Sequence, residues 1–522
     1  MCMTGENGYT YQRNRWTHGR VSITPLPPPS LERNQSMQVN AKTNMEAAAS
    51  DSQVVQTVSL LVQKARAAQA VYAQYDQAAV DEVVTAVAWT LLDPKTNRRL
   101  SEQAVADTGL GRVEDKIIKN HRKTLGLLRD LKRARSVGVV AEYPDKGLIE
   151  IARPVGVVGA VVPSTNPVAT PYNKTLNALK GGNAVILAPS PKGQAVAEEV
   201  VKLMRGALRQ LGAPEDLVQK LPTPVSKAFT HELMQQVDLV VVTGSQNNVR
   251  AAATSGTPAI GVGAGNVPSI VDETADLGAA AARITASKTF DNATSCSSEN
   301  SLVAVDAIYD ELLAELRKRG ARLLDAAEKE RLRDTMWPDG RLSGKITAKS
   351  AKEILELAGI DDRGGQTSII LVEEDRPDAD SKFCDEKLSP VLTVFRAQDF
   401  ADATDIVNGV LDINGKGHSV SLHSSDEARA MKLGLTLPVC RVIVNQAHCF
   451  ATGGSFDNGL PFSLSMGCGT WGGNNISDNM NYRHYLNTTR ISTTISADQP
   501  SLDEIFGDYW HKFGIQPNLD DE

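Results

Sequence analysis

Apolar residues between Val54 and about Leu131 recur at helical spacing. Val58, Leu61 and Val62 form one set, and a second set consists of Val80, Val83, Val84, Val87 and Leu91. Steps of three and four residues place such side chains on one face of a helix. This pattern predicts a helical segment that buries one face.

Two short runs, 137–142 and 147–153, flank Tyr143-Pro-Asp-Lys146 and predict a β-hairpin. Beyond it, strands at 155–162, 184–188 and 239–242 alternate with helices that end near Leu179 and Leu211. Such alternation is typical of a parallel, doubly wound α/β sheet. An exposed hairpin of this kind often pairs with another subunit.

A second α/β stretch, 272–470, has strands near 301–305, 368–371 and 441–444. At 522 residues the chain exceeds what one hydrophobic core usually supports. The pattern therefore predicts two α/β domains that face each other across a cleft, where ligands commonly bind.

Residues 1–45 have a different composition, with Pro25, three prolines at 27–29, few apolar residues and a small positive excess. This composition predicts disorder. A transit peptide, or a true start at Met37 or Met45, is the alternative.

The formal net charge of −7 and the lack of a basic block argue against nucleic acid as a partner. No apolar window approaches the length of a membrane helix, and the start lacks a signal peptide. We expect a soluble, cytoplasmic protein whose partners are small molecules.

The six cysteines (Cys2, Cys296, Cys384, Cys440, Cys449 and Cys468) form no CxxC pair and have no His companions at zinc spacing. Neither a disulfide framework nor a metal site is indicated. Cys296 lies among small and hydroxylated neighbours, as a nucleophile would. A buried, inert thiol is the alternative for Cys296 alone.

Polar and glycine-rich turns follow several predicted strands. Asn166 follows the first strand, where its amide can donate to an oxyanion; an ordinary Asn-Pro turn is the alternative. The turns 181–183 and 243–245 allow a dinucleotide to approach the backbone, or are plain connections. The glycines of 261–266 lack the Lys-Ser/Thr of a phosphate loop, so we interpret them as a packed turn that lines a cleft. The glycine-dense segment 467–474 predicts a tight irregular loop.

In this order, these motifs together with 386–390 and the Trp471 loop resemble the aldehyde dehydrogenase superfamily over almost the whole chain beyond residue 45. The resemblance implies an NAD(P)-binding, Rossmann-like domain (46–136 and 156–271) and a catalytic domain (272–470). It also implies an oligomerisation arm made of the hairpin 137–155 and a strand within 471–522. A homodimer or homotetramer is expected.

Hydrolytic members of this superfamily carry a glutamate that activates water, and Val262 stands at the matching position. Without that base, a thiol is a better acyl acceptor than water. The segments 291–292, 386–390 and 467–473 likewise resemble the coenzyme-A-acylating branch, which implies coenzyme A as co-substrate. A hydrolytic enzyme and a catalytically silent homologue are the rival readings.

The resemblance also implies residue roles. Cys296 is the nucleophile, Asn166 binds the oxyanion, Glu386 holds the nicotinamide ribose and Lys174 lies near the nicotinamide. The full set expected at the cofactor is Ser164, Thr165, Lys174, Ser190, Lys192, Thr243, Gly244, Ser245, Gly263 and Glu386. Pro191 stands where members that prefer NAD often have a glutamate, so NADP is favoured over NAD.

The segment 441–458 is expected to form part of the aldehyde pocket, with Asn445, His448 and Cys449 as substrate contacts. Asn445, Gln446, His448 and the amides near Gly453 can hold an anionic tail. With 474–484, this segment most resembles members that act on sulfoacetaldehyde. Succinate semialdehyde, acetaldehyde and propanal are the alternatives.

Overall fold

The computed structural model describes residues 31–362 and 364–516, with side chains from residue 52 onward. The chain divides into two compact units, 1–53 and 54–522. The predicted disorder of residues 1–30 lies outside the described residues. Residues 31–45 are helical rather than disordered, as the first part of α1 (Leu31–Tyr72). The segment 31–53 contains no proline and several good helix formers, which favours this backbone.

Three further helices confirm the predicted helical segment: α2 (Gln77–Leu92), α3 (Pro94–Thr108) and α4 (Val113–Lys132). The apolar set of α2 is buried, from Val80 to Leu91. Asp76 caps α2 by accepting from the Ala79 amide, and Asp93 caps α3 by accepting from the Thr96 amide. These caps satisfy N–H groups that the helix itself leaves unpaired.

The first sheet has five parallel strands in the order β5-β4-β3-β6-β7. Its strands are β3 (Val157–Val161), β4 (Ala184–Ala188), β5 (Val218–Lys220), β6 (Leu239–Val242) and β7 (Ala259–Gly261). The helices that connect them are α5 (Ala169–Lys180), α6 (Gln194–Gln210), α7 (Lys227–Gln236) and α8 (Gln246–Ala253). From β3 the chain runs first to one side of the sheet and then to the other. The carboxyl ends of β3 and β6 therefore form a switch point, where such sheets bind ligands.

The second sheet has seven parallel strands in the order β10-β11-β12-β9-β8-β13-β14. They are β8 (Val267–Val271), β9 (Glu299–Val305), β10 (Ala321–Leu323), β11 (Ile369–Glu373), β12 (Val391–Ala397), β13 (Val420–His423) and β14 (Val442–Val444). The helices are α9 (Leu277–Thr289), α10 (Tyr309–Arg317), α11 (Ala326–Met336), α12 (Ala351–Leu357), α13 (Phe400–Ile413), α14 (Glu427–Thr436) and α15 (His448–Ala451). Because β8 pairs with β9 and β13, the change of sheet falls before Val267 and not after residue 271.

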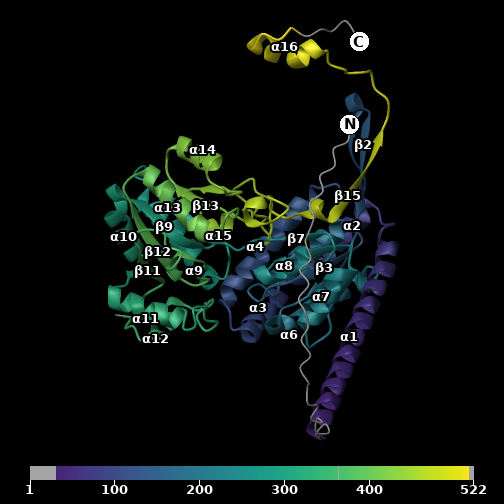
Figure 1. Ribbon diagram of the computed structural model, residues 1–522, viewed down its shortest axis with the longest axis horizontal. Coiled ribbons are helices and arrows are strands. Elements are labelled where there is room, and N and C mark those ends of the chain that lie inside the picture. Colours follow the sequence, from purple (N-terminus) through teal and green to yellow (C-terminus); the bar gives the residue numbers. More distant parts are fainter. Residues whose placement is uncertain (1–30, 363, 517–522) are drawn as a thin grey trace, which may run out of the picture. The chain divides into compact units, whose positions relative to one another are not determined.

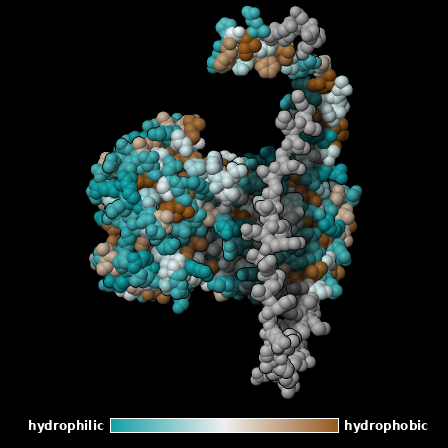
Figure 2. All heavy atoms as spheres, in the orientation of Figure 1, coloured by the Kyte–Doolittle hydropathy of each residue, from teal (hydrophilic) through white to brown (hydrophobic). Residues whose placement is uncertain are grey.

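The predicted hairpin is confirmed as β1 (Gly138–Tyr143) and β2 (Leu148–Pro154). Gly147 closes the turn at φ 57°, a conformation that glycine adopts at no steric cost. Strand β15 (Leu486–Ser492) pairs antiparallel with β2 and completes a three-stranded arm. The last helix, α16 (Leu502–Phe513), has a row of exposed apolar side chains (Figure 2): Leu502, Ile505, Phe506, Tyr509 and Phe513.

Each large sheet has a hydrophobic core of its own, and the two groups of helices and strands are separate in Figure 1. A third, smaller core lies around α11 and α12. The predicted fold class, two doubly wound α/β domains with a β-arm, is confirmed. Within the described part of the chain, no helix is long and apolar enough to cross a membrane.

Candidate active site

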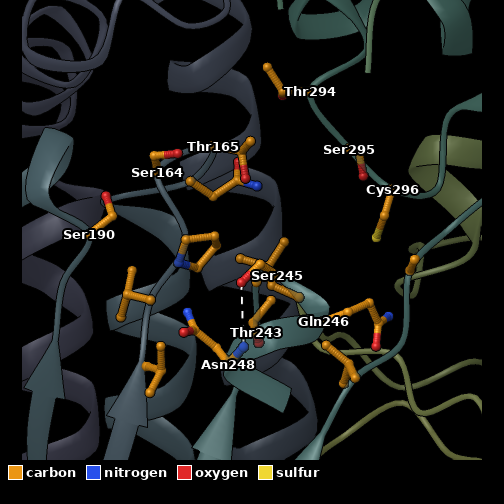
Figure 3. Close-up of a pocket in the computed structure, with 18 of the residues that line it drawn as sticks. Ser164, Thr165, Ser190, Thr243, Ser245, Gln246, Asn248, Thr294, Ser295 and Cys296 are labelled. Carbon is orange, nitrogen blue, oxygen red and sulfur yellow. Dashed lines mark hydrogen bonds between the residues drawn. The ribbon is translucent and has the colours of Figure 1, made fainter. Parts of the chain in front are cut away.

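A cavity of about 770 Å³ lies at the predicted switch point. Loops after β3 and β6 form one wall, and the segment 294–297 before β9 forms the opposite wall (Figure 3). The predicted site residues that line it are Ser164, Thr165, Asn166, Ser190, Thr243, Gly244, Ser245, Gly263, Cys296, Glu386 and Cys449. The structure thus brings together most of a set that spans nearly three hundred positions of the sequence.

Cys296 lies in the loop between η4 (Phe290–Ala293) and β9, and its thiol points into the cavity (Figure 3). The loop is tightly constrained. Asp291, Asn292 and Ala293 adopt left-handed φ angles of 51°, 51° and 55°. A Cβ on Gly265 would lie 2.0 Å from the Cys296 carbonyl oxygen. Only glycine at 265 permits this approach, so the glycine turn 261–266 positions the thiol.

The Asp291 carboxylate anchors this loop to α4. It accepts hydrogen bonds from Lys119 Nζ at 2.6 Å, from Lys116 Nζ at 3.1 Å and from the Arg112 amide at 2.8 Å. Burial opposes the negative charge, but the lysines nevertheless hold the pKa of Asp291 below its usual range. The carboxylate is therefore ionised and neutralises part of the positive charge of α4.

Lys119 also fixes the side chain of Asn166. Its Nζ donates to Asn166 Oδ1 at 3.0 Å. Because the amide oxygen is occupied, the Nδ2 donor is the free end of the Asn166 side chain, and no partner for it is recorded within residues 52–516. An amide N–H held in this way, in the same cavity as a thiol, is suited to bind an oxyanion.

The cavity contains two ionisable groups, Cys296 and Glu386, whose pKa values are both raised. Burial raises the pKa of Cys296 to about 12, and the Glu386 carboxylate adds to the effect. Burial and then Asp385 raise the pKa of Glu386 to about 8. The thiolate is therefore disfavoured until positive charge enters the cavity.

Four predicted contacts do not line the cavity. Lys174 is fully buried and donates to the carbonyls of Val161 at 2.6 Å and Val241 at 3.0 Å, so it joins β3 to β6. Lys192 is exposed on the short helix η2 (Pro191–Gly193). Neither Lys174 nor Lys192 is among the lining residues of the cavity.

Asn445 and His448 are the other two. Both side-chain groups of Asn445 bond to the Ser424 backbone. His448 is buried, and its Nδ1 lies 2.7 Å from the Ser297 carbonyl oxygen. Burial lowers the pKa of His448 to about 4, so the ring is neutral and supplies no cation. Gln446 is absent from the lining too, and its Oε1 accepts from Asn458.

The most important residues that the sequence pattern did not indicate are Lys116, Lys119 and Lys123. Spacings of three and four residues place them on one face of α4, which continues in the buried Leu127 and Leu131. Their position in line with the apolar face of a helix is the sequence signal that could have indicated them. Lys123 lines the cavity itself.

Hydroxyl groups, a lysine and a histidine gather where the cavity meets α7. Ser190, Ser226, Lys227, Thr230 and His231 line this part, and Ser190 Oγ is buried without a hydrogen-bond partner. The lining carboxylates, Asp385 and Glu386, come from the segment after η6 (Lys382–Cys384). These hydroxyl groups, the glycine turn 243–245 and Lys227 lie beside the switch point. Such a set fits a dinucleotide, whose phosphate groups accept hydrogen bonds.

Comparison with known proteins gives a consistent picture. The aldehyde dehydrogenase family profile matches residues 32–459. A sulfoacetaldehyde dehydrogenase (acylating) from Cupriavidus necator is 59% identical over 460 residues, covering 88% of this chain and 93% of that protein.

Solved structures agree with the sequence comparison. An acetylating aldehyde dehydrogenase from Geobacillus thermoglucosidasius superposes with a TM-score of 0.82 at 33% identity, over 86% of this chain and 99% of that one. A Rhodopseudomonas palustris propionaldehyde dehydrogenase, solved with bound CoA and an acylated cysteine, superposes with a TM-score of 0.76 at 28% identity, over 84% and 97%. The chain belongs to the aldehyde dehydrogenase family.

Proposed function

We propose that this protein is a CoA-acylating aldehyde dehydrogenase that converts sulfoacetaldehyde, coenzyme A and NADP to sulfoacetyl-CoA and NADPH, and the reverse. The observation that carries the proposal is a thiol, Cys296, which shares a cavity with an oriented amide, Asn166, while Val262 replaces the water-activating glutamate. The high identity to the acylating enzyme of C. necator supports both the reaction class and the substrate.

The reaction follows from these groups. The Cys296 thiolate attacks the aldehyde carbon, and the oxyanion that forms accepts a hydrogen bond from Asn166 Nδ2. Bound NADP supplies the hydride acceptor and, while oxidised, a positive charge. Loss of the hydride leaves an acyl thioester on Cys296. The thiolate of coenzyme A then attacks the acyl carbon, and Cys296 leaves as a thiolate.

Water is a poor acceptor at this site. Val262 is almost fully buried at the cavity wall and cannot remove a proton. Oδ1 of the nearby Asp385 carboxylate accepts from the Glu386 amide at 2.6 Å and from Asn414 Nδ2 at 2.8 Å. A thiol loses its proton more readily than water does and so depends less on a general base. This favours coenzyme A as the acyl acceptor.

NADP is the proposed cofactor, with NAD as the alternative. The cavity wall around Ser190 and α7 offers Lys227 and His231 but no carboxylate that would repel a 2′-phosphate. Lys192 is exposed on the neighbouring η2. Glu386 is proposed to hold the nicotinamide ribose, whereas Lys174 is now assigned to the support of β3 and β6.

A homo-oligomer in the cytoplasm is the proposed state. The exposed strand β15 and the apolar row on α16 favour association with further copies of the chain. A thiol nucleophile remains active in a reducing compartment.

NADPH formation from sulfoacetaldehyde, succinate semialdehyde and acetaldehyde, each with and without coenzyme A, tests the proposal. We expect strict dependence on coenzyme A and the highest kcat/KM with sulfoacetaldehyde. Equal rates without coenzyme A would show a hydrolytic enzyme. Loss of all activity in Cys296→Ala is expected, and survival of activity would exclude the nucleophile.

A further inference from the structure

Sulfoacetaldehyde requires a cation close to the reacting thiol, because one methylene separates the sulfonate from the aldehyde carbon. A sulfonate that enters a buried cavity loses its water, and a charged hydrogen bond is needed to offset that cost. The residues predicted to hold the tail do not supply it. His448 is neutral and lies outside the lining, and both ends of the Asn445 amide are occupied.

Lys123 reaches the cavity from α4, on the wall that includes Cys449, Gly453 and Ser463. Its Nζ donates to the carbonyl oxygens of Gly453 at 2.8 Å and Gly454 at 3.2 Å. An ammonium has three N–H groups, so one remains after these two bonds. A Cβ on Gly453 would lie 2.9 Å from this nitrogen, and glycine at 453 thus makes room for the ammonium.

Lys123 differs from the other lysines of its helix face in its charge balance. Lys116 and Lys119 both form ion pairs with Asp291. No ion pair is recorded for Lys123 across the residues that the structure describes. The groups that act on it are the Cys449 thiol, the like charges of Arg122 and Lys119, and the uncharged Phe462 ring, whose centroid lies 5.5 Å from the Lys123 Nζ. Burial therefore lowers the pKa of Lys123 to about 7, as expected for a cation that lacks a counter-ion.

We propose that Lys123 binds the sulfonate of the substrate and determines the preference for an anionic aldehyde. This inference rests on the proposed function. The sulfonate supplies the missing counter-ion and accepts the third N–H of the ammonium. The carbonyls of Gly453 and Gly454 hold the ammonium in place before the substrate arrives.

The ratio of kcat/KM for sulfoacetaldehyde to kcat/KM for propanal tests this proposal, because propanal carries an uncharged methyl group in place of the sulfonate. We expect Lys123→Met to lower the ratio about tenfold to a hundredfold, the loss typical of a charged hydrogen bond. Lys123→Arg should recover part of it. The matched control Lys132→Met changes a lysine of the same helix that does not line the cavity, and it should leave the ratio unchanged.

An equal loss with both aldehydes in Lys123→Met would overturn the proposal and indicate that Lys123 only holds the 453–454 loop. An unchanged ratio would overturn it as well. If the unaltered enzyme shows no CoA-dependent oxidation of sulfoacetaldehyde, then the proposed function itself fails.

A second measurement needs no variant. Ethanesulfonate should inhibit propanal oxidation by the unaltered enzyme competitively, and the inhibition should weaken as the pH rises and the Lys123 ammonium loses its proton. Inhibition that is absent, or that does not vary with pH, would contradict the proposal. Cys449, Arg122 and Lys119 are the titratable groups that act electrostatically on Lys123.

Discussion

Lys119 links the nucleophile loop to the proposed oxyanion donor through one ammonium group. Its Nζ lies 2.6 Å from Asp291 Oδ2 and 3.0 Å from Asn166 Oδ1. The position of the loop and the orientation of the amide are thereby coupled. Lys119 acts through Asn166 and is a positioning residue.

We predict that Lys119→Met lowers kcat with little change in KM. Without the hydrogen bond from Lys119, the Asn166 amide is less well oriented and stabilises the oxyanion less. Asn166→Ala should lower kcat by about 10² to 10³, the usual cost of one oxyanion donor. The double variant should be little slower than Asn166→Ala alone, since both changes remove one function. Steady-state kinetics of the three variants checks this, and fully additive losses would contradict the link.

Glu386 affects the thiol through its charge. It is mostly neutral below its pKa of about 8 and becomes an anion above it, where it opposes ionisation of Cys296. We predict that Glu386→Gln speeds alkylation of Cys296 by iodoacetamide about threefold or more at about pH 9, with a smaller effect at about pH 6, because each pKa unit is a tenfold change in the thiolate fraction.

The alkylation rate is read from the mass of the peptide that contains Cys296. Cys296→Ala serves as the control for the other thiols. An effect of equal size at both pH values would mean that the glutamine acts through packing and not through charge.

At the scale of elements, the turn after β7 and the loop before β9 depend on each other. A Cβ at position 265 would meet the Cys296 carbonyl oxygen at 2.0 Å and the Cys296 Cβ at 2.9 Å. One of the two segments must move if this glycine is replaced. The geometry of the thiol therefore depends on the glycine turn as much as on its own loop.

We predict that Gly265→Ala lowers the free energy of unfolding by about 1 to 3 kcal/mol, as overpacking usually does. It should also lower kcat at least tenfold, since the thiol moves. Gly206→Ala in α6 is the matched control because no atom lies within 4 Å of its added Cβ. Chemical unfolding and kinetics check both variants, and a fully active Gly265→Ala would contradict the close packing.

Most strands could be predicted because each is a short apolar run between turn residues. The predicted run 184–188 coincides with β4, and 239–242 coincides with β6. The order of strands could not be predicted, because it depends on contacts far apart in the sequence. For the same reason the boundary between the two domains was predicted after residue 271, although β8 belongs to the second sheet.

The site could be predicted where the signal is local. Cys296, Asn166 and the turn at 243–245 all line the cavity, as their sequence contexts indicate. Lys119 and Lys123 show only their helix-face spacing in the sequence, and their hydrogen-bond partners are 172 and 330 residues away. His448 was assigned to the substrate because its burial is a tertiary property that the sequence does not display.

At the scale of the whole molecule, each of the two α/β domains supplies a different part of the cavity. The five-stranded sheet supplies Asn166 and the hydroxyl-lined wall, and the second domain supplies Cys296 and Glu386. Cys296 lies partly exposed in the cavity, so its reactivity depends on what enters. This arrangement suits a reaction in which the acyl thioester on Cys296 persists until the thiol of coenzyme A binds.

The most direct test of the account is to incubate the protein with sulfoacetaldehyde and NADP without coenzyme A and to measure the masses of its peptides. We predict a sulfoacetyl adduct on the peptide that contains Cys296, stable in water and released as sulfoacetyl-CoA when coenzyme A is added. An adduct on another cysteine, or one that hydrolyses as fast without coenzyme A as with it, would contradict the account.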